Sequence, residues 1–268
     1  MKCLNRGTNT MIEWSLFGVL VGIIMGVSGA GGGTIAVPLF IYGLGYDPVT
    51  ATVASLIAVS VAALSNWWGQ RQNTLYPFSF GIFLVAFIFI QILKPVKAML
   101  PSGSTQIAFL LVTLYSLITY WKNLTGSKNF DTEKPKFKWK DLQKIFLSGL
   151  GVAMITIFTG LGGGVLIMPL LLGPIKVPLP YAIPTSLLTI SSTAMVGAYS
   201  QSDQFEKIFT TQKMLGLTLG VWLSVALTKR LIKALPHEQM NKIRVGVYTT
   251  VMGVALLSML YSTFQSFQ

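Results

Sequence analysis

The chain has 268 residues, of which 52% are hydrophobic and only 10% are charged. A soluble domain carries about 25% charged residues, and one globule of this length cannot bury so much apolar surface. We therefore expect lipid to be the solvent and the chain to be a multi-pass protein of the plasma membrane. The net charge of +12 would suit nucleic acid, but the basic residues fall in short segments between apolar runs. The positive-inside bias explains that placement and argues against a nucleic-acid partner.

Eight apolar runs follow one another along the chain. Runs of about 20 apolar residues are long enough to cross a bilayer as helices. Trp, Tyr or Lys near the ends of most interior runs would anchor them at the membrane surface. The sequence therefore predicts an all-α integral membrane protein. The runs cover residues 12–44, 48–68, 76–93, 106–122, 142–173, 179–199, 213–232 and 243–262.

The first and fifth runs are too long for one ordinary span, and glycines interrupt both. A shift of 131 residues superimposes these interruptions, and a shift of 135 superimposes the later parts of the two halves. We therefore predict two homologous halves of four runs each: a first membrane repeat (1–122), a cytoplasmic linker (123–141) and a second membrane repeat (142–268). The shifts pair Gly31, Gly32 and Gly33 with Gly162, Gly163 and Gly164, Pro38-Leu39 with Pro169-Leu170, Ser60 with Ser191, and Leu100-Pro101 with Leu235-Pro236.

Two threadings through the membrane are compatible with these runs. Either all eight runs span, or the first and fifth runs each form a re-entrant hairpin that enters and leaves on one face. The hairpin threading gathers more of the 20 basic residues on one side, because it places Lys229, Lys242 and Arg244 on the same side as Arg71. It also gives each half three crossings, which makes the halves an inverted repeat. We prefer it, with both chain ends outside.

The two glycine signatures resemble those of the TauE/SafE family of sulfite exporters. They read Gly29-Ala30-Gly31-Gly32-Gly33 before Pro38-Leu39 and Gly160-Leu161-Gly162-Gly163-Gly164 before Pro169-Leu170. The small-residue segments from Ala51 to Ser60 and from Ala182 to Ser191 are similar to that family as well. The resemblance implies a plasma-membrane permease for sulfite, sulfonates or related small anions. The family-like Thr-Ser pair stands at Thr185-Ser186 but reads Ala54-Ser55 in the first half, which puts a threonine-type contact there in doubt.

A glycine-rich interruption can hold an anion. Each glycine in mid-helix costs roughly 0.8–1 kcal/mol relative to alanine, and irregular backbone survives in a membrane only where it is buried or lines a cavity. The helix that restarts presents N–H groups and a positive dipole end. We therefore predict a substrate site at Gly31, Gly32, Gly33, Thr34, Ser55, Gly162, Gly163, Gly164, Thr185 and Ser186. The alternative is that the glycines only allow close helix packing and the serines only bond neighbouring backbone.

The acidic residues all lie at run ends or in loops, so no carboxylate stands in mid-membrane as a cation ligand or proton relay would. Cys3 and His237 lie outside the runs, which argues against an enzyme, a metal site or a cofactor. We expect an exporter or permease for small sulfur-containing anions such as sulfite or organosulfonates, bound between the two broken helices. The alternatives are a membrane scaffold without transport and a carrier of another small organic anion. Association of identical chains is left open.

Overall fold

The computed structural model describes residues 10–29, 32–97, 111, 113–122, 135, 137, 139–159, 164–200 and 211–266. Within these residues every regular element is a helix, which confirms the predicted all-α class. In the first half the elements are α1 (Thr10–Ser28), α2 (Gly33–Pro38), the π-helix η1 (Leu39–Gly43), α3 (Pro48–Gln70), the 3₁₀ turn η2 (Arg71–Asn73) and α4 (Tyr76–Lys97). In the second half they are α6 (Asp141–Thr159), α7 (Gly164–Leu172), α8 (Leu179–Tyr199), α10 (Thr211–Ala234) and α11 (His237–Ser266). Residues 113–122 are also helical.

The interrupted runs each give one long helix followed by a short one. α1 and α6 both have 19 residues, whereas α2 has six and α7 has nine. Proline lies inside both short helices, as Pro38 and Pro169. The residues that join each pair of helices include Gly31, Gly162 and Gly163, which lie outside the described residues.

The start of α3 shows how the local sequence sets a helix boundary. Asp47 is the N-cap and accepts a hydrogen bond from the Thr50 N–H at 3.0 Å, and Pro48 occupies the first helical position. Pro fits there because its missing N–H would have no partner in the helix. The hydrogen bonds from the side chain and backbone of Thr50 lower the pKa of the exposed Asp47 carboxyl.

Four helices of the described residues are long and apolar enough to cross a membrane. They cover Met11–Ser28, Val49–Asn73, Tyr76–Leu93 and Lys213–Ala234. α8 has 21 residues, which gives a length of about 31 Å at 1.5 Å per residue. α8 is therefore also long enough to cross the roughly 30 Å hydrocarbon layer.

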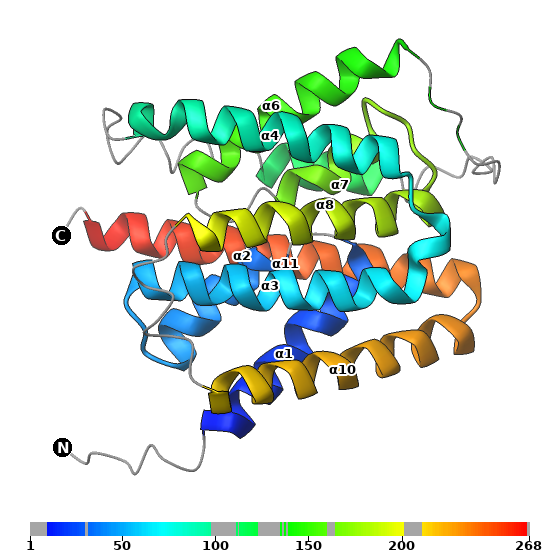
Figure 1. Ribbon diagram of the computed structural model, residues 1–268. Helices are drawn as coiled ribbons and strands as arrows, with labels where there is room; N and C mark the ends of the chain where they lie inside the picture. The colour runs from blue at the N-terminus through cyan, green and yellow to red at the C-terminus, as the bar shows by residue number, and fades with distance from the viewer. Residues whose placement is uncertain are drawn as a thin grey trace, which may run out of the picture.

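The helices form a bundle in which α1 runs parallel to α10 and α4 runs parallel to α6 (Figure 1). α3 and α8 lie side by side at the centre and are antiparallel. α1 packs along α10 on one flank, and α6 packs along α4 on the other. The core between them consists of apolar side chains together with many small ones, such as Ala54, Ala58 and Ala194.

Glycines allow α1 and α10 to approach closely. A Cβ atom at Gly18 of α1 would lie 2.6 Å from the Leu217 carbonyl oxygen of α10. A Cβ atom at Gly220 of α10 would overlap the Ser15 carbonyl oxygen of α1. Small residues have this role at helix interfaces in membranes, where close backbone approach replaces the hydrophobic drive available in water.

The helix ends form two groups at opposite ends of the bundle. The connections α3–α4, α7–α8 and α10–α11 lie at one end, and the starts of α1, α3 and α10 lie at the other (Figure 1). The first group carries Arg71, Lys176, Lys229, Arg230 and Lys233. We call it the basic end. The division of the chain into 1–122, 123–141 and 142–268 stays a prediction, and most of the linker lies outside the described residues.

Candidate functional site

The carbonyl groups at the end of α1 accept hydrogen bonds from other helices. The last carbonyls of any helix lack intrahelical donors and need other partners when they are buried. Arg244 of α11 donates its Nε–H to the Val27 oxygen at 3.2 Å. Tyr120, in the helix at 113–122, donates its hydroxyl to the Ser28 oxygen at 3.1 Å. Side chains distant in sequence therefore hold the position where α1 stops.

Gly29 extends this arrangement to α8. Its φ of +64° is left-handed, a conformation that glycine adopts without steric cost. Ser186 of α8 donates its hydroxyl to the Gly29 oxygen at 2.7 Å. A Cβ atom at Gly29 would lie 3.1 Å from Ile183 Cγ1, so the backbone here also packs directly against α8.

The start of α7 has a comparable group of hydrogen bonds for a different reason. In a regular helix the Val165 oxygen accepts from the N–H four residues later, but that residue is Pro169, which has no N–H. The Ser116 hydroxyl donates to the Val165 oxygen at 3.1 Å, and the Tyr248 hydroxyl donates at 3.5 Å. The proline inside α7 thus creates an acceptor that side chains of two other helices fill.

Two stacked tyrosines connect the end of α1 with the start of α7. The ring centroids of Tyr120 and Tyr248 are 3.8 Å apart, with 16° between the ring planes. Both side chains are about 1% exposed. Tyr120 bonds to the end of α1 and Tyr248 to the start of α7, so the pair bridges the two interrupted runs.

Arg244 is a buried cation beside this tyrosine pair. Its side chain is only 8% exposed, and it lies one helical turn before Tyr248 on α11. Besides the Val27 oxygen, Nη1 donates to the Asn241 side-chain oxygen at 3.2 Å. These two acceptors, the partners recorded for Arg244 within the described residues, carry no net charge. A guanidinium buried among neutral acceptors favours the approach of an anion, because its charge remains uncompensated.

Three of the predicted glycines are buried at helix starts. Gly32 is the N-cap of α2, Gly33 is the first residue of α2, and Gly164 is the first residue of α7. Thr34 lies in α2, but its side chain is outside the described part of the structure. The predicted roles of Gly31, Gly162 and Gly163 likewise concern residues that the structure does not describe.

The three predicted hydroxyl residues have different partners. Ser55 donates to the Thr52 oxygen of its own helix at 2.8 Å. Thr185 donates to the Tyr181 oxygen at 2.6 Å and accepts from the Leu75 N–H at 3.0 Å, which ties α8 to the start of α4. Ser186 bonds to Gly29, at the end of α1. A substrate contact stays a prediction for all three. Of the three, Ser186 is the one that bonds next to the end of α1, where Arg244 also donates a hydrogen bond.

Sequence reasoning missed Arg244, Tyr120 and Tyr248. It counted Arg244 only as one of the basic residues that set the topology, whereas Arg244 lies inside α11 and is buried. The available signal was its place at the start of an apolar run, since ionisable residues within membrane helices usually face the interior and mark functional sites. The tyrosines had no comparable signal, because tyrosine is also common at the membrane surface.

Comparisons with known proteins agree with this membrane architecture. The family model described as "Sulfite exporter TauE/SafE" matches residues 14–258. A "Probable membrane transporter protein" from Xylella fastidiosa strain Temecula1 is 27% identical over 231 residues, which cover 80% of this chain and 83% of the relative. A protein of the same description from strain 9a5c is 26% identical over 230 residues, with the same coverage. No solved structure matches the chain. The chain therefore belongs to the TauE/SafE family and is a membrane transporter by family.

Proposed function

We propose that this protein carries small sulfur-containing anions, such as sulfite or organosulfonates, across the plasma membrane and binds them at Arg244. The carrying observation is the burial of Arg244 beside the end of α1, with two neutral acceptors as its recorded partners. Membership of the TauE/SafE family supports the general role, a membrane transporter. Family membership alone specifies neither the anion nor its binding site.

The chemistry of the guanidinium suits an oxyanion of sulfur. Arg244 has five N–H donors in a planar fork, and the two recorded bonds use two of them. Sulfite and sulfonate groups present several oxygens that such a fork can bind in pairs, with charge-assisted bonds about twice as strong as neutral ones. An arriving anion would compete with the Val27 oxygen for the guanidinium. Binding would therefore be coupled to the hydrogen bonds that hold the end of α1.

We also infer that the two halves form an inverted repeat, in which the interrupted runs are equivalent. Ser60 and Ser191, which the 131-residue shift pairs, bond reciprocally: each hydroxyl donates to the other residue's carbonyl oxygen at 3.2 Å. Such mutual bonds are expected where a local two-fold axis passes between α3 and α8. The antiparallel directions of these helices, and the matching packing of α1 with α10 and of α6 with α4, support the same inference (Figure 1). Transporters often place their site where such repeats meet.

The placement of the helix ends supports the hairpin threading. α1 and α3 start at the same end of the bundle, so the first run leaves that end and returns to it through α2 and η1 (Figure 1). The positive-inside bias then makes the basic end cytoplasmic. Under this threading Arg71, Lys229 and Arg230 lie on the cytoplasmic side.

Export is the direction that the physics favours. At about 100 mV, inside negative, each negative charge that leaves gains roughly 2.3 kcal/mol, enough for about a fifty-fold gradient of a monoanion. An exporter therefore needs no coupled ion, whereas an importer does. Strict dependence of transport on an inward proton gradient would contradict this direction.

The test is flux of sulfite, sulfate, thiosulfate and sulfoacetate into liposomes that contain the purified protein, under imposed potentials. We expect the wild type to move at least one of them and Arg244→Gln to lower that flux roughly ten- to hundred-fold, since a charged hydrogen bond contributes about 1.5–3 kcal/mol. Arg244→Lys keeps the charge but loses the fork, so we expect an intermediate flux. Arg230→Gln is the matched control, because Arg230 is an exposed arginine at the basic end.

Two results would count against the proposal. If Arg244→Gln transports as well as the wild type, the anion does not bind at Arg244. If the folded wild type moves none of the four anions, the substrate class is wrong, and a scaffold role or another organic anion becomes the better proposal.

A further inference from the structure

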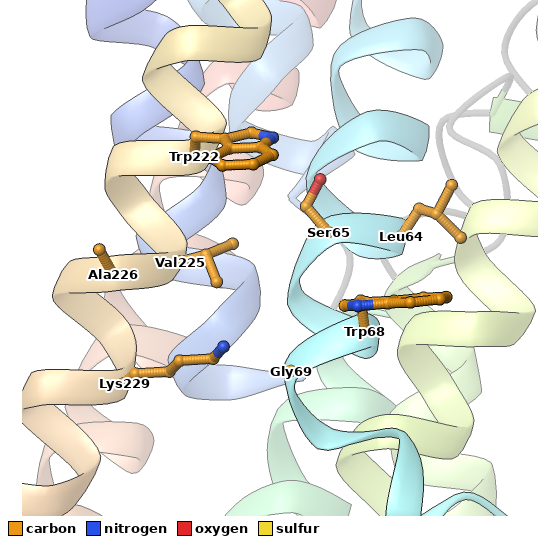
Figure 2. A pocket seen from close by; sticks show the side chains of 8 residues that line it. All are labelled: Leu64, Ser65, Trp68, Gly69, Trp222, Val225, Ala226 and Lys229. Carbon is orange, nitrogen blue, oxygen red and sulfur yellow. The ribbon is translucent and has the colours of Figure 1, made fainter.

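A groove away from the proposed anion site opens between α3 and α10 (Figure 2). It encloses about 590 Å³, and none of the predicted site residues lines it. Its walls are mainly apolar, and the Trp222 ring points from α10 toward α3, where Leu64 and Trp68 lie one helical turn apart (Figure 2). Its lining includes Leu64, Trp68, Trp222, Val225, Ala226 and Lys229.

A polar pocket of about 470 Å³ adjoins the groove at the basic end and shares Trp68, Gly69 and Lys229 with it. Arg71 and three neutral polar side chains of α3 and η2 complete its lining. None of the residues that line either space is acidic. The two spaces together form an apolar slot that ends in a positively charged mouth.

The two cations of this mouth are held by specific contacts. A Cβ atom at Gly69 would lie 2.6 Å from Lys229 Cε and 3.3 Å from Nζ, so the missing side chain gives Lys229 room to cross from α10 to α3 (Figure 2). The Arg71 Cζ atom lies 4.4 Å from the centroid of the Trp68 ring, within cation–π distance. Lys229 and Arg71 therefore reach the same mouth from different helices.

We propose that this slot binds one anionic phospholipid, with its phosphate between Lys229 and Arg71 and an acyl chain along Trp222 and Leu64. The charge of the mouth complements a phosphate, and the apolar walls complement a hydrocarbon chain. Trp222 lies seven residues before Lys229, about 10 Å deeper along α10, which is the direction that an acyl chain takes from its headgroup. Basic pockets between helices on the cytoplasmic side are suited to anionic lipid, which is enriched in that leaflet.

A lipid fits the slot better than the transported anion does. Sulfite has no apolar part, so it would leave the wall formed by Leu64, Val225 and Ala226 without a partner. The slot also lies between α3 and α10, whereas Arg244 belongs to α11 and contacts the end of α1. The lipid site can therefore be tested without reference to transport.

The test is native mass spectrometry of the full chain in detergent, titrated with phosphatidylglycerol or with phosphatidylcholine that has the same acyl chains. We expect one phosphatidylglycerol to bind with preference over phosphatidylcholine. The double variant Arg71→Gln, Lys229→Gln should bind it more weakly, on the order of ten-fold or more. The control variant Arg230→Gln, Lys233→Gln removes two exposed charges of the same end that do not line the slot, and it should bind as the wild type does.

A second variant tests the apolar part. Ala226→Trp fills the groove and should also weaken phosphatidylglycerol binding, although Arg71 and Lys229 are both unchanged. The proposal is overturned if both lipids bind equally or if the control variant loses as much affinity as the mouth variant. It is also overturned if glycerophosphate alone competes as strongly as the whole lipid, which would indicate a free-anion site. A dimer that Ala226→Trp dissociates would identify the slot as an interface between two copies instead.

Discussion

Ser55 and Ser186 occupy equivalent positions in the two halves but have different bonds. Ser55 bonds within α3, whereas Ser186 crosses from α8 to the Gly29 oxygen. Both are buried, at 1% and 0% exposure, so the two sites differ in the bond and not in solvent access. The pair therefore isolates the contribution of one hydrogen bond between helices.

We expect Ser186→Ala to lower the free energy of unfolding by about 1 kcal/mol, because the buried Gly29 oxygen loses a donor. Ser55→Ala should change it by a few tenths, since the Thr52 oxygen keeps its place inside a regular helix. Reversible unfolding in mixed micelles, followed by circular dichroism, measures both. Equal losses would mean that the bond to Gly29 does not stabilise the end of α1.

The residues of the site were predictable to the extent that local chemistry marks them. The glycines at 32, 33 and 164 were found because they interrupt apolar runs, and they do begin helices. Arg244 was counted only as a topology-setting charge because it follows Lys242 closely and stands at the start of an apolar run. Only the fold brings its side chain to Val27, which lies 217 residues earlier in the chain.

At the scale of the helix, the stop of α1 combines backbone conformation with packing. Gly29 and Gly45 both have left-handed φ values, +64° and +69°. A Cβ atom at Gly29 would meet Ile183 at 3.1 Å, whereas a Cβ atom at Gly45 would meet nothing within 4 Å. Both glycines therefore have left-handed backbone, but only Gly29 also packs closely against another helix.

We expect Gly45→Ala to cost roughly 1–2 kcal/mol, the penalty of a left-handed alanine. Gly29→Ala should cost more, because Ile183 must also move by a few tenths of an ångström in a packed interface. The unfolding assay used for the serines measures the difference. If the two variants were equally stable, the α8 contact would not constrain the end of α1.

At the scale of the whole molecule, the sequence predicted the helical class of the elements better than it predicted which helices are neighbours. Apolar periodicity and run length mark membrane helices, because every span must satisfy its own backbone. Which helices pack together depends on surface shape, and membrane spans are apolar on all sides, so hydrophobicity does not distinguish their faces. The close packing of α1 with α10 became readable only from the contacts of Gly18 and Gly220. The internal duplication says more about helix neighbours than hydrophobicity does, because Ser60 and Ser191, which it pairs, lie at the contact between α3 and α8.

The two threadings make opposite predictions for two loops, which single cysteines can report. In the hairpin threading Ser200, after α8, faces outside, and Gln239, near the start of α11, faces the cytoplasm. If all eight runs span, both assignments are reversed. Both residues are exposed, so a cysteine at either position is accessible to a reagent in the adjoining solution.

We expect an impermeant maleimide added to intact cells to label Ser200→Cys and to leave Gln239→Cys unlabelled until the membrane is opened. The background is Cys3→Ser, which removes the chain's one native cysteine. Gln72→Cys is the control, because both threadings place η2 in the cytoplasm and it should stay protected in intact cells. The physical reason is the basic end: translocating Lys229, Arg230 and Lys233 outward would oppose the positive-inside bias. Labelling of Gln239→Cys alone would reverse the second half and remove the inverted repeat, because the two halves would then have the same orientation.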